Sequence, residues 1–414
     1  MGPIASRLLN RLIKTGSLVI AEPDGSKTIL GDGTGERFEI LFHDHRVVGD
    51  LLTNPALRFP ELYMEGRWSV IEGDLAGLIL LAFRNNAPQV ASPMRTKIRT
   101  AMRRMRQRNT ARSARRNATH HYDVGNDIYA LFLDEDWQYS CAYFTSPTVT
   151  LEEAQLAKKR HIASKLLIEN GHKVLDIGCG WGGMGLYLAD NLGADVTGIT
   201  LADEQVRRAN QRAGGRPDVR FLVQDYRGVK ETFDRIVSVG MFEHVGVNYY
   251  DGFFQSCART LADDGVMLLH SIGRPDGPGF TSPFIGKHIF PGGYIPALSE
   301  VLPAIERSGL IVTDIEIWRL HYAETLKAWK ERFTAAEEEV VRLRDEQFFR
   351  MWQIYLASCE ASFRAGDMMV FQIQLAKSLS TVPLTRDYMT RTEQSLAARD
   401  TAQAVRPALV ARRG

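Results

Sequence analysis

One stretch gives the strongest indication of the fold of this chain: Val174-Leu175-Asp176-Ile177-Gly178-Cys179-Gly180-Trp181-Gly182-Gly183. An apolar run leads into an acidic residue and a glycine-rich turn, and an apolar helical pattern follows over 183–192. Glycine lets a backbone approach a ligand closely, and a helix N-terminus beside it offers free N–H groups. The stretch therefore predicts a ligand pocket at the carboxyl end of a parallel strand.

Helical and extended patterns alternate from residue 151 onward. We expect strands at 173–177, 195–199, 219–223, 235–239 and 266–271. We expect helices at 151–170, 183–192 and 202–213, a mostly helical segment at 323–377, and a loop over the pocket rim at 284–290. Such alternation predicts an α/β fold with a doubly wound, Rossmann-like sheet, helices on both of its faces and further helical additions.

The chain divides into four parts by composition and pattern. Residues 1–90 predict a small α+β domain, because extended segments at 17–21, 26–30 and 37–43 are separated by turn signals and followed by helical patterns. An amphipathic pattern at 1–15 fits either a helix docked on this domain or one lying on a membrane surface. Residues 91–118 predict a basic linker, 119–392 a catalytic domain, and 393–414 a disordered Ala- and Arg-rich tail.

The charge of the chain is unevenly distributed. The net charge is +2, yet the segment from Arg95 to Arg116 holds ten Lys or Arg residues and no acid. Such a segment can contact anionic lipid headgroups, or it can be a solvated linker facing the acidic remainder of the protein. It lacks interleaved aromatic residues for base stacking, so we expect no nucleic-acid partner.

Cysteine usage and hydropathy favour a cytoplasmic location, and the basic segment adds the expectation of a peripherally membrane-associated protein. The four cysteines form no C-x-x-C pair, which argues against a zinc site or a disulfide framework. His120 and His121 have no third ligand at suitable spacing, so we expect no metal. The longest apolar run, 75–83, is too short to cross a bilayer, and we expect no secretory signal.

The glycine turn departs from the common nucleotide motifs. It lacks the G-x-G-x-x-G spacing of dinucleotide-binding proteins and the G-x-x-x-x-G-K of a P-loop. An acid before G-x-G in this strand order is instead the pattern of class I S-adenosylmethionine methyltransferases. Gly178 and Gly180 would let the methionine part of the cofactor lie against the backbone, and Asp176 would sit near its amino group. A dinucleotide dehydrogenase is the alternative reading of the same turn.

Two later segments complete the predicted cofactor site. Thr200 and Gln205 follow the second strand, where such enzymes hold the ribose hydroxyls. Tyr226 and Arg227 follow the third strand, where the adenine usually lies, so that Tyr226 could cover a ring face and Arg227 could serve a polar edge. Each of these residues could equally be an ordinary surface residue.

A set of ordered motifs gives a closer resemblance. They are His120–Asp127, Gln138–Phe144, Asp176–Gly183, Gly240–Gly246, Leu268–Gly273, Ile289–Gly293 and Tyr322–Leu326. Together they resemble the cyclopropane-fatty-acyl-phospholipid synthases, which are related to the mycolic acid cyclopropane synthases. The resemblance covers about 120–375. The N-terminal segment, with Tyr63-Met64-Glu65-Gly66, resembles the small extra domain of the bacterial phospholipid enzymes, which the mycolic acid enzymes lack.

The resemblance implies a reaction, two cofactors and a set of residues. S-adenosylmethionine would donate a methylene group to a cis double bond of an unsaturated phospholipid acyl chain, and a bound bicarbonate would act as the base. Cys141 and Ile272 would hold this anion through backbone groups, Glu243 and His270 would orient it, and Tyr322 would donate a hydrogen bond. Tyr139 and Ser140 would contact the methionine end of the cofactor. A homodimer is also implied.

Elementary chemistry agrees with this reading. An isolated alkene is a weak nucleophile, and its attack on a sulfonium methyl group leaves a carbocation that a dry site with aromatic rings and a held anion can stabilise. Candidate aromatics for an acyl tunnel are Tyr143, Phe144, Phe280, Phe284 and Phe290. The same cation could instead give a methyl- or methylene-branched chain. A small-molecule N- or O-methyltransferase and a catalytically silent binding module are the more distant alternatives.

Overall fold

A computed structural model describes residues 9–10, 12–85, 107 and 124–411 of the 414-residue chain. Three parts of the chain lie outside the described residues: most of the segment at 1–15, the basic segment between Arg95 and Arg116 apart from Gln107, and the pair His120 and His121. Predictions that rest on them therefore stay predictions.

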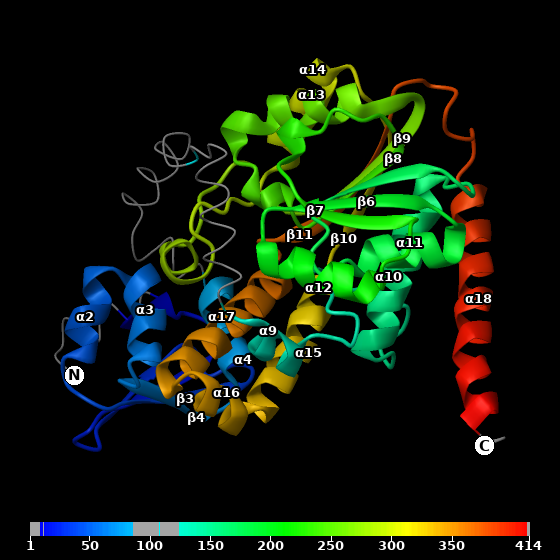
Figure 1. Cartoon of the computed structure of the whole chain (residues 1–414). Coiled ribbons are helices and arrows are strands. Elements are labelled where there is room, and N and C mark those ends of the chain that lie inside the picture. Colours follow the sequence, from blue (N-terminus) through cyan, green and yellow to red (C-terminus); the bar gives the residue numbers. More distant parts are fainter. Residues whose placement is uncertain (1–8, 11, 86–106, 108–123, 412–414) are drawn as a thin grey trace.

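The larger of the two sheets has seven strands in the order β10-β11-β9-β8-β5-β6-β7 (Figure 1). Its strands are β5 (Lys173–Ile177), β6 (Asp195–Thr200), β7 (Val219–Val223), β8 (Phe233–Val239), β9 (Leu261–Gly273), β10 (Ile311–Trp318) and β11 (Met369–Ala376). The pairs among β9, β8, β5, β6 and β7 are parallel, whereas β11 runs antiparallel to both β9 and β10. The sheet thus has the doubly wound character that the alternation predicts.

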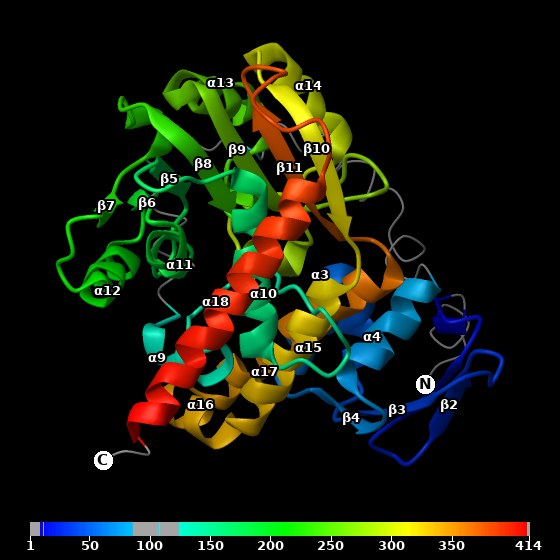
Figure 2. The same ribbon diagram turned by 90° about the vertical axis from the view of Figure 1, so that its right-hand side faces the viewer.

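Helices cover this sheet on both faces (Figures 1 and 2). The helices that precede or connect the strands of this sheet are α10 (Leu151–Leu166), α11 (Gly183–Leu192), α12 (Asp203–Ala213), α13 (Tyr250–Thr260) and α14 (Leu298–Ser308). Helix α10 begins with a capping box between Thr150 and Glu153, which satisfies backbone N–H groups that a helix start leaves open. A second set of helices continues the chain: α9 (Asn126–Phe132), α15 (His321–Ala335), α16 (Glu337–Leu343) and α17 (Glu346–Ala365).

The strand prediction is incomplete in the second half of the chain. β5 and β7 have the expected bounds, and β6, β8 and β9 are longer than expected. Strand β10 was not predicted, and β11 falls inside the segment expected to be mostly helical, so that expectation is wrong for its last residues. The rim segment forms one turn of π-helix, η4 (Ile285–Ile289), within the expected loop.

The N-terminal region contains a four-stranded sheet in the order β2-β1-β3-β4. Its strands are β1 (Ser17–Ala21), β2 (Lys27–Leu30), β3 (Arg37–Phe42) and β4 (Trp68–Glu72), and its helices are α2 (Val47–Thr53), α3 (Pro55–Met64) and α4 (Leu75–Arg84). One apolar core continues from this sheet into the catalytic helices and includes Trp68, Leu78, Trp329 and Trp352. The small α+β region is therefore fused to the rest of the protein by a shared core.

The C-terminal segment is helical, in contrast to the disordered tail expected from residue 393. Helix α18 spans Asp387–Ala411 and runs alongside α10 (Figure 2). Leu396 is 1% exposed and belongs to the core beneath the sheet. Arg160 Nη1 donates to Asp400 Oδ2 at 3.0 Å, and Arg399 Nη1 donates to the carbonyl of Asn191 at 2.6 Å. The buried Leu396 and these polar bonds fix the helix against the catalytic domain, although its composition suggested disorder.

No helix within 9–85 and 124–411 has the length and apolar character needed to span a membrane.

We predict that Leu396→Ala destabilises the protein by about 2 to 5 kcal/mol, because it removes buried methyl groups and leaves a cavity. Chemical denaturation monitored by circular dichroism measures the change. Ser395→Ala, at the exposed neighbouring position of the same helix, is the control and should leave the midpoint unchanged. Equal midpoints for Leu396→Ala and the control would mean that α18 does not pack on the sheet.

Candidate functional site

A cavity opens at the carboxyl ends of β5, β6 and β8. All nine residues predicted to bind the cofactor line it, namely Tyr139, Ser140, Asp176, Gly178, Gly180, Thr200, Gln205, Tyr226 and Arg227. They come from four separate segments of the chain, three of which lie at or after the carboxyl ends of the parallel strands β5, β6 and β7 and so meet at one edge of the sheet. The sequence prediction and the geometry therefore agree on where a ligand would bind.

Two glycines of the turn after β5, Gly178 and Gly182, leave no room for a side chain. Gly178 has a φ of 86°, and a Cβ built there would lie 2.6 Å from Met241 Cβ. Gly182 has a φ of 84°, and its Cβ would lie 2.6 Å from Phe221 Cζ. A larger residue at either position would strain the backbone and clash with its neighbour. The turn thus stays close against both the sheet and the cavity.

Asp176 is the most perturbed acid of this cavity. Its side chain is buried, and its Oδ2 atom has no hydrogen-bond partner among the described residues. Burial raises the pKa of Asp176 to about 7, and the charge of Lys158 opposes that rise. A buried, unpaired carboxylate oxygen at a cavity wall is costly unless a ligand satisfies it. A positively charged ligand group fits this position.

The polar residues at or after the ends of β6 and β7 in the cavity wall are held in place by contacts with each other. Thr200 Oγ1 donates to Gln205 Oε1 at 2.9 Å, and Gln205 is buried. Arg227 Nε donates to the Tyr226 hydroxyl at 3.3 Å, and its guanidinium lies 5.2 Å from the Tyr226 ring centroid. These pairs present hydroxyl, amide and aromatic groups to one ligand.

Several lining residues were not predicted as ligand contacts. They are Trp137, Gln138, Trp181, Gln224, His244 and the rim residues Pro291 and Gly292. His244, the neighbour of Glu243, also lines the cavity, and burial lowers its pKa to about 4. Lys158 lies behind the wall, where its Nζ donates to Ser140 Oγ at 2.9 Å and to Gln138 Oε1 at 2.5 Å. No sequence pattern distinguishes this buried lysine from the other basic residues of α10.

The five predicted anion-binding residues lie beside this cavity rather than in its lining. Glu243 belongs to the short helix η2 (Phe242–His244), between lining residues Met241 and His244. The backbone N–H of Ile272 donates to Glu243 Oε1 at 2.7 Å, whereas Glu243 Oε2 has no partner among the described residues. Burial raises the pKa of Glu243 to about 7, and the bond from Ile272 opposes the rise.

Tyr322 lies within electrostatic range of both Glu243 and Cys141. Burial raises the pKa of Tyr322 well above its ordinary value, and the neighbouring acid Glu243 acts in the same direction. Burial also raises the pKa of the Cys141 thiol, which therefore stays protonated at neutral pH. Cys141 Sγ contacts the carbonyl of Ala142 at 3.3 Å. The Tyr322 hydroxyl is therefore a protonated donor near Glu243, whereas the Cys141 thiol already faces the Ala142 carbonyl.

His270 reaches this region from β9, two residues before Ile272 on the same face of the strand. Its Nδ1 lies 3.0 Å from Gln372 Nε2, and Trp318 packs edge-on against its ring with a centroid distance of 5.0 Å. Burial lowers the pKa of His270 well below its ordinary value, and the charges of Lys158 and Lys165 act in the same direction. The imidazole is therefore neutral at physiological pH.

The candidate tunnel aromatics are dispersed. Tyr143 is stacked between His161 and His321, with centroid distances of 4.4 and 4.7 Å. Phe290 lies near His244 at 5.7 Å and near Tyr355 at 6.1 Å, close to the cavity rim. Phe284 is buried beside His288. Phe284 and Phe290 remain candidates for an acyl-chain wall, whereas Tyr143 packs with the histidines.

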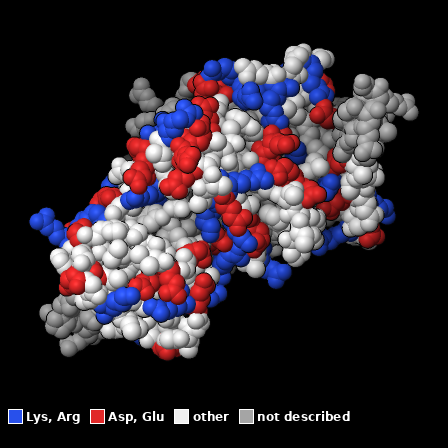
Figure 3. Space-filling model, turned by 90° about the horizontal axis from the view of Figure 1, so that it is seen from below, with Lys and Arg blue, Asp and Glu red and all other residues white. Residues whose placement is uncertain are grey.

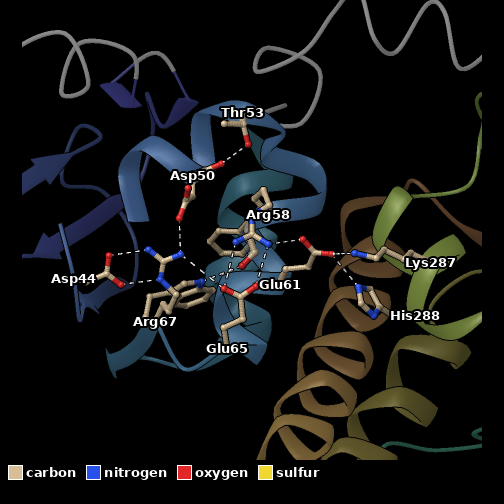
Figure 4. Close-up of polar contacts among 11 residues, drawn as sticks. Asp44, Asp50, Thr53, Arg58, Glu61, Glu65, Arg67, Lys287 and His288 are labelled. Atoms are coloured by element: carbon tan, nitrogen blue, oxygen red, sulfur yellow. Dashed lines mark hydrogen bonds and ion pairs between the residues drawn. The ribbon is translucent and has the colours of Figure 1, made fainter. Parts of the chain in front are cut away.

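The N-terminal region anchors the rim of the cavity (Figure 4). Glu61 of α3 accepts hydrogen bonds at its Oε1 from Lys287 Nζ at 2.6 Å and from His288 Nε2 at 3.0 Å. Burial would raise the pKa of Glu61, but bonds from Lys287, His288 and Arg58 outweigh burial and lower the pKa to about 2. Helix η4 is thus tied to α3, and it ends two residues before Pro291, which with Gly292 lines the cavity.

The sheet order and the placement of the cavity define an S-adenosylmethionine-dependent methyltransferase fold. The crystal structure of mycolic acid cyclopropane synthase CmaA1 complexed with SAH and CTAB superposes with a TM-score of 0.60 at 34% identity, covering 63% of this chain and 97% of that one. The family model described as mycolic acid cyclopropane synthetase matches residues 109–373. The chain therefore belongs to the mycolic acid cyclopropane synthetase family.

Two relatives differ in how much of this chain they match. Cyclopropane-fatty-acyl-phospholipid synthase of Escherichia coli is 38% identical over 330 residues, covering 80% of this chain and 85% of the relative. Cyclopropane mycolic acid synthase 3 of Mycobacterium tuberculosis is 37% identical over 277 residues, covering 63% of this chain and 96% of the relative. The longer match with the Escherichia coli protein agrees with the expected kinship of the N-terminal region.

We predict that Glu61→Gln speeds hydrogen exchange at the rim, because the amide that replaces the carboxylate holds Lys287 and His288 less strongly. The amides of Gly286 and Phe290, which bond to Ser282 and Ile285, should report the change. Glu65→Gln is the matched control, because Glu65 pairs with Arg58 and Arg67 and not with η4. Equal exchange in the two variants would show that Glu61 does not anchor the rim.

Proposed function

We propose that this chain transfers a methylene group from S-adenosylmethionine to a cis double bond of an unsaturated phospholipid acyl chain, forming a cyclopropane ring. The observation that carries the proposal is the pairing of two sites. The cavity lined by all nine predicted cofactor residues adjoins Glu243, a buried carboxyl with one unpartnered oxygen among the described residues. The match to the Escherichia coli synthase supports the same activity.

The residues of the cavity fit S-adenosylmethionine. When bound, this cofactor supplies an electrophilic methyl group. Gly178 and Gly180 leave the backbone open to close approach, and Asp176 Oδ2 offers a charge for the ammonium group. Thr200 and Gln205 offer hydroxyl and amide groups to the ribose, and Tyr226 and Arg227 offer a ring face and polar N–H groups to the adenine.

The residues around Glu243 fit a small anion such as bicarbonate. Such an anion would accept the proton that the transferred methyl group loses. With a pKa near 7, Glu243 carries a proton in part of the molecules at neutral pH and can donate it from Oε2. Tyr322 stays protonated and offers a donor, and the protonated Cys141 thiol adds no competing negative charge. The neutral ring of His270 has one N–H group to add.

The lipid substrate implies contact with a membrane surface. In the view of Figure 3, Lys and Arg side chains alternate with Asp and Glu, and no single-sign patch dominates that face. Our proposal of peripheral contact with anionic lipids therefore depends on the basic segment between Arg95 and Arg116. Two further parts of the proposal are a cytoplasmic location, which rests on cysteine usage and the short apolar runs, and a homodimer, which follows from the family resemblance.

We predict that affinity for S-adenosylhomocysteine, which keeps the amino group, rises about tenfold between pH 6 and pH 8. Asp176 has a pKa near 7 in the folded protein, so it is mostly protonated at pH 6, and binding an ammonium group must release that proton. Isothermal titration calorimetry in buffers of different ionisation enthalpy measures both effects. Asp176→Asn should bind weakly at every pH. A pH-independent affinity of the wild type would contradict the assignment of Asp176.

We predict that expression in a host without such enzymes converts unsaturated acyl chains into chains heavier by one CH2 group, with loss of alkene signals in NMR spectra of the lipids. Glu243→Gln should lower kcat by about a hundredfold to a thousandfold while S-adenosylhomocysteine still binds. Glu306→Gln, on the exposed side of α14, is the control. A mass gain with the alkene retained would contradict ring formation, and loss of cofactor binding in Glu243→Gln would make Glu243 a cofactor ligand.

A further inference from the structure

A buried polar network connects α10 to the anion-binding region through the sheet. Lys165 of α10 is 2% exposed, and Gln372 of β11 is 1% exposed. Lys165 Nζ donates to Gln372 Oε1 at 2.6 Å, and Gln372 Nε2 lies 3.0 Å from His270 Nδ1. Gln372 and His270 are directly opposed across the antiparallel β11–β9 pair, so the register of the sheet holds them together.

The donor and acceptor inventory of these three side chains allows one arrangement. A lysine ammonium group only donates, so the glutamine must turn its carbonyl oxygen toward Lys165. The NH2 group of Gln372 then faces His270, where it can only donate. His270 Nδ1 must therefore accept, and the single proton of the neutral ring resides on Nε2.

Acidic side chains on the side of Lys165 away from Gln372 stabilise its positive charge. Lys165 Nζ also contacts Glu316 of β10, and His161 Nε2 lies 2.7 Å from Glu316 Oε2. His161 Nδ1 in turn lies 3.3 Å from the Glu393 carboxylate of α18. Burial lowers the pKa of Lys165, and the neighbouring carboxylate of Glu316 opposes that shift. An acid thus keeps the ammonium form in place next to Gln372.

The position of the ring proton decides what His270 offers to an anion. Because Gln372 occupies Nδ1, Nε2 is the ring nitrogen left for a ligand. With the proton on Nε2, the ring donates a hydrogen bond to the anion. With the proton on Nδ1, Nε2 would present a lone pair and repel it.

We propose that Lys165 and Gln372 are positioning residues that fix the Nε2–H tautomer of His270. The tautomer assignment stands on the hydrogen-bond network alone. Its consequence for catalysis rests on the proposed function, because it concerns how His270 holds the anion during methylene transfer. Neither Lys165 nor Gln372 lines the cofactor cavity.

The direct test is the ring ¹⁵N spectrum of the wild-type protein labelled at histidine, with His270 assigned by its absence in His270→Asn. We expect a protonated Nε2 and an unprotonated Nδ1 at pH 7, whether or not activity is measured. A protonated Nδ1, or a mixture of the two tautomers, would overturn the proposal.

The variant Gln372→Glu tests the control of the tautomer. A carboxylate cannot donate to Nδ1, so it should draw the ring proton to that atom and exchange the two ¹⁵N signals. We expect kcat to fall about tenfold to a hundredfold, with the KM for S-adenosylmethionine unchanged. An unchanged spectrum in folded Gln372→Glu would refute the role of Gln372. If that variant does not fold, Gln372→Met removes the donor without adding charge and should give a mixture of tautomers.

Gln374→Glu is the matched control, because Gln374 lies two residues along the same face of β11 and is also 1% exposed. Its amide donates to the carbonyl of Lys165 at 2.5 Å and to the Tyr388 hydroxyl at 2.7 Å, so it touches the same helix but not His270. We expect a similar loss of stability, with the His270 spectrum and kcat close to wild type. A matching loss of kcat in this control would assign the effect to packing.

Failure of the proposal and failure of the proposed function are distinguishable. If the wild type shows the Nε2–H tautomer but forms no modified lipid, the proposed function fails and the tautomer assignment stands. If lipids gain rings while Nδ1 carries the proton, the proposed function stands and the positioning role fails.

Discussion

The hydrogen bond from the Ile272 backbone to Glu243 Oε1 joins the two halves of the site. It links the segment that follows β8, which supplies the cavity wall at Met241 and His244, to the end of β9, which carries His270. Because the bond uses one carboxylate oxygen, the other is directed elsewhere and remains unpartnered among the described residues. A buried acid held on one side only is costly to the fold, and such costs are typical of sites that bind a ligand.

Burial leaves the side chains around Glu243 largely neutral, whereas Lys165 and Glu316 nearby form an ion pair. Burial keeps the Tyr322 hydroxyl and the Cys141 thiol protonated, and it keeps Glu243 protonated in a fraction of the molecules at neutral pH. These groups therefore carry little negative charge. Beneath them, Lys165 and Glu316 remain a charged pair because each compensates the other. The neutral His270 lies between these regions, and Gln372 connects it to the charged pair.

The sequence was sufficient for the parts of the fold that rest on strong local patterns. Apolar runs ending in glycine located β5 and its turn, and the segments after β6 and β7 could be assigned to the cavity because parallel strands end at one edge. Helix α18 was missed because its helical segment is rich in Ala and Arg, and its stability comes from Leu396 and from bonds to Asp400 that link residues distant in sequence.

Strand β11 shows why part of the site lies beyond sequence reasoning. All eight of its residues are buried, and Gln372 and Gln374 interrupt its apolar run. Their amides are satisfied by Lys165, His270 and Tyr388, which lie far away along the chain. No local pattern reveals such partners, so neither the strand nor the positioning role of Gln372 could be read from composition or spacing. The same holds for Lys158 behind the cavity wall.

The most direct test of the account uses purified protein, vesicles of an unsaturated phospholipid and S-adenosylmethionine carrying a deuterated methyl group. The account predicts that one of the three deuterons is released, and that the product carries a CD2 group in a saturated three-membered ring, seen by NMR of the extracted lipid. Retention of all three deuterons in a methyl branch, or a CD2 group on an alkene carbon, would contradict it.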